Sequence, residues 1–185
     1  MEIKGLVIQN RKEFAEECFG KDAWQKVLDN LSQADREAIG DLVLAAKWYP
    51  FELGERIDRA IVNVLGGGKN RVFEDIGAKS AQRSLMKVHR SFLTRGDPQA
   101  FMKKVEIMYK FYYDIGRREY TPTGPTSGVM TTYDAETASA SDCLTIIGFH
   151  KEALRMCGAR NVEVVEEECR ARGGSCCRYR FTWDM

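Results

Sequence analysis

The sequence has no excess of charge of one sign, no long apolar run and only two histidines. Its 28 basic and 27 acidic residues give a formal charge of +1, whereas domains that bind nucleic acid present a clearly basic face. No apolar run approaches the roughly 18–20 residues that span a bilayer, and the first residues lack the apolar stretch and cleavage site of a signal peptide. We therefore expect a cytoplasmic protein with neither a membrane span nor a nucleic-acid partner.

Apolar residues at helical spacing run through the first two-thirds of the 185-residue chain. They predict helices over residues 24–31, 39–46 and 53–64. Between the first two of these, the stretch from Ser32 to Asp35 has the form of a capping box, which begins a helix.

The character of the chain changes after Gly116, where Thr, Tyr, Gly and Pro become frequent. The pattern favours two extended segments, a helix over 139–157 and two strands around a Gly-Gly turn. We predict an α+β fold, with a helical half and an antiparallel sheet that has one helix packed across it. The chain is expected to form a single domain, 1–185, in which 1–116 are the helical half and 117–185 the α/β half.

Six cysteines are present: Cys18, Cys143, Cys157, Cys169, Cys176 and Cys177. Cys169 and Cys177 bracket the predicted turn, so their thiols can lie side by side at the base of a hairpin. Cys143 falls in the first turn of the predicted helix, where thiolate is favoured. Two or three thiolates are a partial ligand set for tetrahedral zinc, and a reducing cytoplasm disfavours a disulfide.

A purely structural interpretation of these cysteines competes with the metal site. The seven residues between Cys169 and Cys177 are not a zinc-finger spacing, and buried cysteine often acts as a small apolar side chain. We expect Cys18 and Cys157 to be core residues of this kind. Cys176 should face away from Cys177 and take no part.

Glutamates just before Cys169 offer a fourth ligand, but the geometry of a regular strand is unfavourable. Glu166 and Cys169 are three residues apart and would face opposite sides. A β-bulge near Val165 would turn Glu166 toward Cys169. Without a bulge, Glu167 would occupy that face.

The segment from Cys143 to Phe181 resembles the 4-vinyl reductase domain family. In that family a cysteine opens a helix, a glycine follows a turn later, and an E-x-x-C-x7-C motif precedes an alternating strand; here the corresponding stretches are CLTIIG and EEECRARGGSCC followed by RYRF. The resemblance implies a structural zinc held by Cys143, Glu166, Cys169 and Cys177. Such a closed set of four ligands leaves no position for a catalytic water.

The N-terminal half resembles a myxobacterial paralogous family of unknown function, through GLVIQNRKEF, KWYPFELGERI and FYYDIGRREY. The whole fold type is related to haem–nitric-oxide-binding domains and to TRAPP vesicle-tethering subunits, which implies a cavity between helices and sheet. The haem-binding relatives need a proximal histidine and a Y-x-S-x-R motif. The chain offers His89 and His150 but no Y-x-S-x-R, so haem is not expected.

The sequence shows no catalytic constellation. There is no G-x-G-x-x-G motif and no matched acid–base pair, and Glu166 to Glu168 are typical of a solvated strand edge. His150 lies about 10.5 Å of helical rise beyond Cys143, too far to share a metal, and His89 is expected at the surface. We therefore favour a protein that is not an enzyme.

The leading hypothesis is a sensory or adaptor protein that binds a hydrophobic small molecule in a mostly apolar cavity. A structural zinc would stabilise the C-terminal half, and a signal would pass to a protein partner or across a homodimer interface. The alternatives are an enzyme or accessory protein of tetrapyrrole metabolism, as the name of the 4-vinyl reductase family suggests, and a TRAPP-like scaffold.

Overall fold

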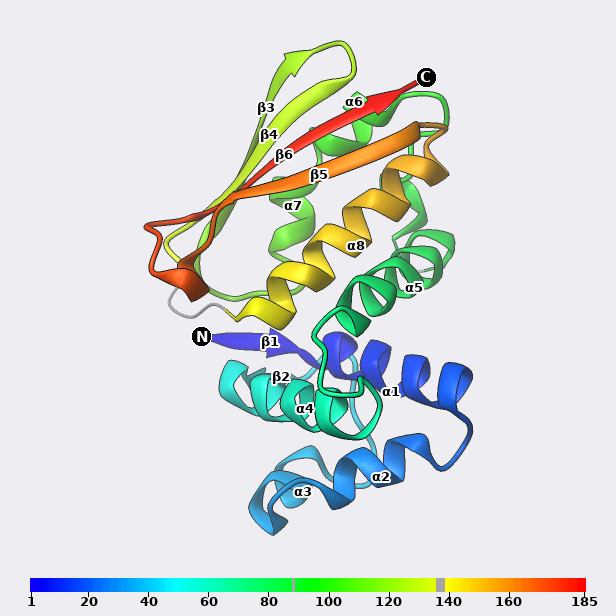
Figure 1. Cartoon of the computed structure of the whole chain (residues 1–185), viewed down its shortest axis with the longest axis vertical. Helices are drawn as coiled ribbons and strands as arrows, with labels where there is room; N and C mark the ends of the chain where they lie inside the picture. The colour runs from blue at the N-terminus through cyan, green and yellow to red at the C-terminus, as the bar shows by residue number, and fades with distance from the viewer. Residues whose placement is uncertain (88, 136–138) are drawn as a thin grey trace.

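The computed structural model describes residues 1–87, 89–135 and 139–185. It confirms the predicted α+β fold: a helical N-terminal region lies beside a four-stranded antiparallel sheet that is covered by helices on one face (Figure 1). The N-terminal elements are β1 (Glu2–Lys4), α1 (Gly5–Phe19), α2 (Ala23–Asp29), α3 (Gln33–Ile39), β2 (Trp48–Pro50), α4 (Phe51–Val64) and α5 (Val72–Met86). The later elements are η1 (Arg90–Phe92), α6 (Pro98–Met102), α7 (Val105–Tyr109), β3 (Arg117–Gly124), β4 (Ser127–Tyr133), α8 (Ala140–Met156), β5 (Arg160–Glu168), η2 (Arg170–Arg172) and β6 (Cys177–Asp184). Within this described part of the chain, no helix is long and apolar enough to cross a membrane.

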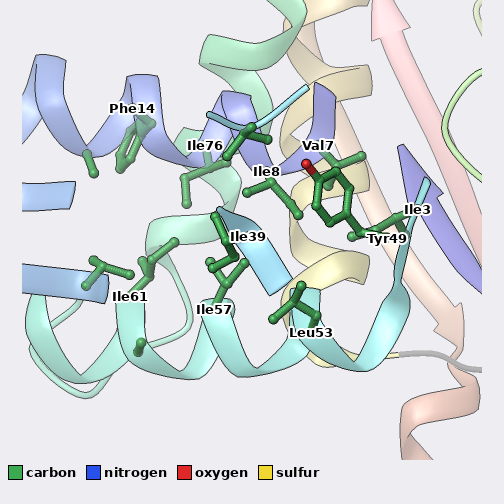
Figure 2. Close-up of a cluster of buried hydrophobic side chains, with 14 of the residues drawn as sticks. Ile3, Val7, Ile8, Phe14, Ile39, Tyr49, Leu53, Ile57, Ile61 and Ile76 are labelled. Atoms are coloured by element: carbon green, nitrogen blue, oxygen red, sulfur yellow. The ribbon is translucent and has the colours of Figure 1, made fainter. Parts of the chain in front are cut away.

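The N-terminal region is organised around an apolar core of its own (Figure 2). On α4, Leu53, Ile57 and Ile61 recur every fourth residue, and all three are buried against the helices around them. The short antiparallel pair β1–β2 closes one end of this core by placing Ile3 opposite Tyr49. Burial of each such side chain contributes about 1.5–3 kcal/mol, so the stripe on α4 holds the region together.

The capping box that begins α3 is confirmed, but the helix predicted over 39–46 is wrong. Ser32 Oγ accepts a hydrogen bond from the backbone N–H of Asp35 at 3.1 Å. The helix then ends at Ile39, because Gly40 adopts a left-handed φ of +72°. The apolar spacing that suggested a longer helix belongs in part to loop residues, of which Leu42 is 67% exposed.

The sheet has the strand order β3-β4-β6-β5, and every neighbouring pair is antiparallel. On β6 the predicted alternation is present: Tyr179 and Phe181 are fully buried, whereas Arg180 between them is exposed. The buried face packs against α6, α7 and α8, which share one apolar core with it (Figure 1). The other face of β6 carries arginines and points away from this core.

Helices α5 and α8 join the two regions through an unusually close contact. A Cβ atom at Gly77 of α5 would overlap the backbone carbonyl of Thr145, and one at Gly148 of α8 would overlap that of Glu74. Each glycine therefore allows the opposite backbone to approach where any other residue would push it away. This contact sets the position of α8 between the N-terminal region and the sheet.

Candidate functional site

Three cysteines from separate elements converge at one end of α8. Cys143 lies in the first turn of α8, Cys169 directly follows β5, and Cys177 begins β6. The Sγ atom of Cys143 is 3.6 Å from that of Cys169 and 3.8 Å from that of Cys177. All three thiols are buried and lie within 4.8 Å of one another. The local structure therefore gathers one helix and two strands around a sulfur cluster.

The sulfur separations suit a shared metal and do not match a disulfide. A tetrahedral zinc with Zn–S bonds of about 2.3 Å holds neighbouring sulfurs roughly 3.8 Å apart, which matches the two separations from Cys143. A disulfide has an S–S length of about 2.0 Å, and all three cysteines are free. Thiolate is also a ligand type that zinc prefers. The chemistry and the spacing of these residues thus fit zinc.

Glu166 and Cys169 lie on the same side of the chain because of a β-bulge. The register of β5 against β6 shifts between Glu166 and Glu168, slightly beyond the position near Val165 that the sequence suggested. One oxygen of Glu166 pairs with Arg172 at 2.7 Å. The other, Oε1, is buried and has no hydrogen-bond partner among the described residues. Although Glu166 is not one of the mutually close ligand atoms, this free oxygen is available as a fourth ligand.

The thiols differ in their affinity for protons. The hydrogen bond to Cys177, together with burial, raises the pKa of Cys143. The same hydrogen bond lowers the pKa of Cys177 to about 6, and the Arg170 backbone N–H also donates to its sulfur at 3.4 Å. Burial raises the pKa of Cys169, and the Glu166 carboxylate adds to that rise. The shared hydrogen bond therefore favours the thiolate form at Cys177 over that at Cys143, and metal binding would displace the protons that the thiols retain.

The exposure of Cys18 and the burial of His89 both differ from what the sequence predicted. Cys157 is buried as expected, but Cys18 is exposed and is not a core residue. His89 is buried rather than at the surface, and its ring packs 5.7 Å from Phe92 and 5.1 Å from Phe111, measured between ring centroids. The nearby Phe92 and the more distant Phe111 together form the aromatic environment around His89, which is buried from solvent.

A cavity of about 60 Å³ lies where the N-terminal region meets α8 and the sheet. Residues of α1, α5, α7, β3 and α8 line it, so it occupies the place between helices and sheet that the sequence analysis suggested. Its apolar wall includes Val7, Met108, Ile146 and Phe149.

Two guanidinium groups reach this cavity, and they differ in how they are neutralised. Arg11 forms a buried two-point ion pair with Asp58, with 2.9 Å between Nη2 and Oδ2. Arg118 donates from Nε to Thr132 Oγ1 at 2.9 Å, but its Nη2 is buried and has no hydrogen-bond partner among the described residues. Burial lowers the pKa of His150, which also lines the cavity, to about 3, so its ring is neutral at ordinary pH.

Residues 70–184 match the family described as "Protein of unknown function (DUF2378)". The chain belongs to this family. The assignment of the C-terminal segment to the 4-vinyl reductase family is therefore wrong, since the DUF2378 match covers that whole segment. The match also begins within the helical half, at residue 70. No curated protein matches the chain.

Solved structures show that this DUF2378 protein has the fold of H-NOX proteins. An Fe(II) unliganded H-NOX protein from K. algicida superposes with a TM-score of 0.74 at 11% sequence identity, covering 98% of this chain and 97% of that one. An H-NOX protein from S. oneidensis, in its Fe(II)NO ligation state, gives 0.72 at 14% identity, covering 98% and 99%. The predicted relation to the haem–nitric-oxide-binding fold is thus confirmed at the level of the fold.

A haem group does not fit the residues of this chain. The cavity of about 60 Å³ is far below the roughly 300–1,000 Å³ that sites for larger organic ligands provide. His150 lines the cavity, but its Nδ1 lies 2.8 Å from the carbonyl oxygen of Ile146 within its own helix. His89 lies among aromatic rings and does not line the cavity. The chain shares the fold of the H-NOX proteins, but its cavity of about 60 Å³ has no room for a haem group.

Proposed function

We propose that this protein is a small-molecule-binding sensory or adaptor module with a structural zinc site. The cavity is the observation that carries the proposal. It has α1 on one side and α8 with β3 on the other, so a ligand inside it contacts both regions of the fold. Its binding free energy would favour the arrangement of those regions that fits it best.

The fold supports a sensory role. The chain superposes over nearly its whole length on H-NOX proteins, one of which was determined in its Fe(II)NO ligation state. The cavity here is formed by packed side chains with a few polar groups among them, which is the usual construction of a small-molecule site.

Zinc would have a structural role in this protein. Cys143, Cys169 and Cys177 would bind it, with Glu166 as the fourth ligand, and the ion would tie the first turn of α8 to β5 and β6. Because the site does not exist in the unfolded chain, the binding free energy of the metal adds to the stability of the fold. With four protein ligands, the ion has no open position for catalysis.

Elemental analysis tests the zinc component. Protein purified without added chelator is expected to contain close to one zinc per chain, and Cys143→Ala should remove it. Cys18→Ala is the matched control, because Cys18 is exposed and outside the cluster. Absence of metal from the natural chain, together with an unchanged melting temperature on zinc addition, would reject this component.

Ligand-observed NMR with a library of molecules smaller than about eight non-hydrogen atoms tests the cavity. Binding is expected in the natural chain and should be lost in Ile146→Phe, which fills the cavity. Ile107→Phe is the control, since Ile107 is 57% exposed and does not line the cavity. Equal binding by the two variants would place the ligand elsewhere.

The tetrapyrrole alternative rested on the 4-vinyl reductase resemblance and has no remaining support. Transfer of a signal to a protein partner or through a homodimer, and a cytoplasmic location, remain predictions from the sequence.

A further inference from the structure

We infer that the cavity binds a small carboxylate with a short alkyl body, whose oxygens pair with the guanidinium of Arg118. This inference rests on the proposed function and names the chemical class of its ligand.

Arg118 is a buried cation with no direct ion-pair partner among the described residues. The residue is 5% exposed, its guanidinium carbon lies 4.8 Å from the centre of the Tyr109 ring, and its Nε is satisfied by Thr132. No described residue forms an ion pair with it, and its Nη2 lacks any hydrogen-bond partner in the same part of the chain. A buried charge of this kind is costly unless it is paired.

The other buried arginine shows how the fold neutralises such a group when the chain supplies the partner. Arg11 has both oxygens of Asp58 as acceptors. The guanidinium fork matches a carboxylate in this two-point manner better than it matches any neutral group. Arg118 lacks such a partner among the described residues and lines the cavity, which makes a carboxylate from outside the chain the complementary group.

Asp142 does not serve as that partner. It is the one acidic residue among those that line the cavity, but its Oδ1 accepts a hydrogen bond from the Tyr113 hydroxyl at 2.7 Å. It forms no ion pair with Arg118. Asp142 attracts Arg118 electrostatically, but no hydrogen bond joins the two among the described residues, and the Nη2 donor of Arg118 has no partner there.

The volume and the remaining wall define the rest of the ligand. One water-sized probe needs about 10–15 Å³, so about 60 Å³ accommodates roughly four to six non-hydrogen atoms. Val7, Met108, Ile146 and Phe149 give most of the wall an apolar surface, which suits a chain of two or three carbons. Ser80 Oγ is buried, lines the cavity and also lacks a hydrogen-bond partner among the described residues, so it can donate to a second carboxylate oxygen.

Isothermal titration calorimetry with sodium propionate, in a buffer free of other carboxylates, tests the inference on the full chain. We expect saturable binding of one propionate per chain. Propionamide, which has the same shape without the charge, should bind at least tenfold more weakly, and octanoate, which exceeds the cavity, should not bind.

Arg118→Gln should weaken propionate binding at least tenfold. The control is Arg117→Gln, because Arg117 lies next to it on β3 but is half exposed and pairs with Glu119 and Asp134. If Arg118→Gln fails to fold, the comparison of propionate with propionamide on the natural chain decides the question.

Four outcomes would overturn the inference. Equal binding of propionate and propionamide would show that charge is not recognised, and unchanged affinity in a folded Arg118→Gln would show that Arg118 is not the partner. If propionate does not bind while an uncharged molecule from the NMR library does, the carboxylate class is wrong but the proposed function stands. If no molecule of either class binds, the cavity holds water and both fail.

Discussion

Gly77 of α5 and Gly148 of α8 each face the backbone of the opposite helix with no room for a side chain. The carbonyls that a Cβ would meet belong to Thr145 and Glu74, which are themselves parts of these two helices. The position of α8 follows from this contact. Through α8, the contact also positions Cys143 at one end of the helix and His150 beside the cavity.

Gly148→Ala should destabilise the protein by about 2–3 kcal/mol, because a new methyl group inside a packed interface forces the backbones apart. Gly54→Ala is the matched control. At that position the obstacle is the end of the flexible Ile3 side chain, and the gain in helix propensity is about 1 kcal/mol. Urea unfolding measures both changes, and similar losses for the two variants would show that the α5–α8 contact can yield.

Asp58→Ala should cost about 3–5 kcal/mol, because it leaves the buried guanidinium of Arg11 without its partner. Replacing both residues, as in Arg11→Met with Asp58→Leu, should cost less than the single change, since no buried charge remains. Denaturant titration of Arg11→Met, Asp58→Leu and the double variant gives the coupling free energy. Additive losses would mean that the two groups do not depend on each other.

Acid should weaken the fold through His150. Burial lowers the pKa of its imidazole from 6.5 to about 3. Between these two values the imidazole is protonated in the unfolded chain and neutral in the folded chain. The contribution of His150 to the free energy of unfolding is fully present above about pH 6.5 and declines as the pH falls toward 3. By pH 5 the loss is about 2 kcal/mol. The free energy of unfolding, measured from pH 7 to pH 5, should fall less steeply in His150→Gln. Parallel curves would assign the acid sensitivity to other groups.

Glu166→Gln should lower the affinity for zinc at least about tenfold, as the loss of a metal-site carboxylate typically does. Glu167→Gln should leave it unchanged, because the neighbouring carboxylate pairs with Arg180 instead of facing the cysteines. Competition with a chromophoric chelator measures both constants. If the two variants bind zinc equally well, the fourth ligand is not Glu166, and the role of the three cysteines is unaffected.

Much of the secondary structure was predictable because its signals are local. Ser139 caps α8 by accepting a hydrogen bond from the backbone N–H of Asp142 at 3.0 Å, as its position before the helix suggested. A β-bulge in β5 was one of the two alternatives that the sequence left open, and the register shift between Glu166 and Glu168 shows it. The helix expected over 39–46 failed because apolar spacing does not reveal that Gly40 reverses the backbone.

The candidate sites were predictable only in part. Cys143, Cys169 and Cys177 could be proposed as partners from residue type and strand geometry, and the structure brings them together. Arg118 was overlooked, because in the run of charges after Gly116 it looks like its exposed neighbour Arg117. The period-2 alternation of β3 was the one signal that places Arg117 and Arg118 on opposite faces of the sheet. It does not indicate whether the buried arginine has a partner.

Capping residues, helical stripes and strand alternation act over a few residues, so local patterns indicated most of the elements, although not the β1–β2 pair or the end of α3 at Ile39. The sulfur separations, the volume of the cavity and the lack of a direct ion-pair partner for Arg118 among the described residues were set by tertiary structure. These properties depend on the α5–α8 contact and on the register of β5, β6 and β3, which bring together atoms that are far apart in the chain. A small shift in the α5–α8 contact or in the strand register changes the sulfur–sulfur distances or the cavity volume. Local sequence patterns do not encode such contacts, because they join segments that are far apart in the chain.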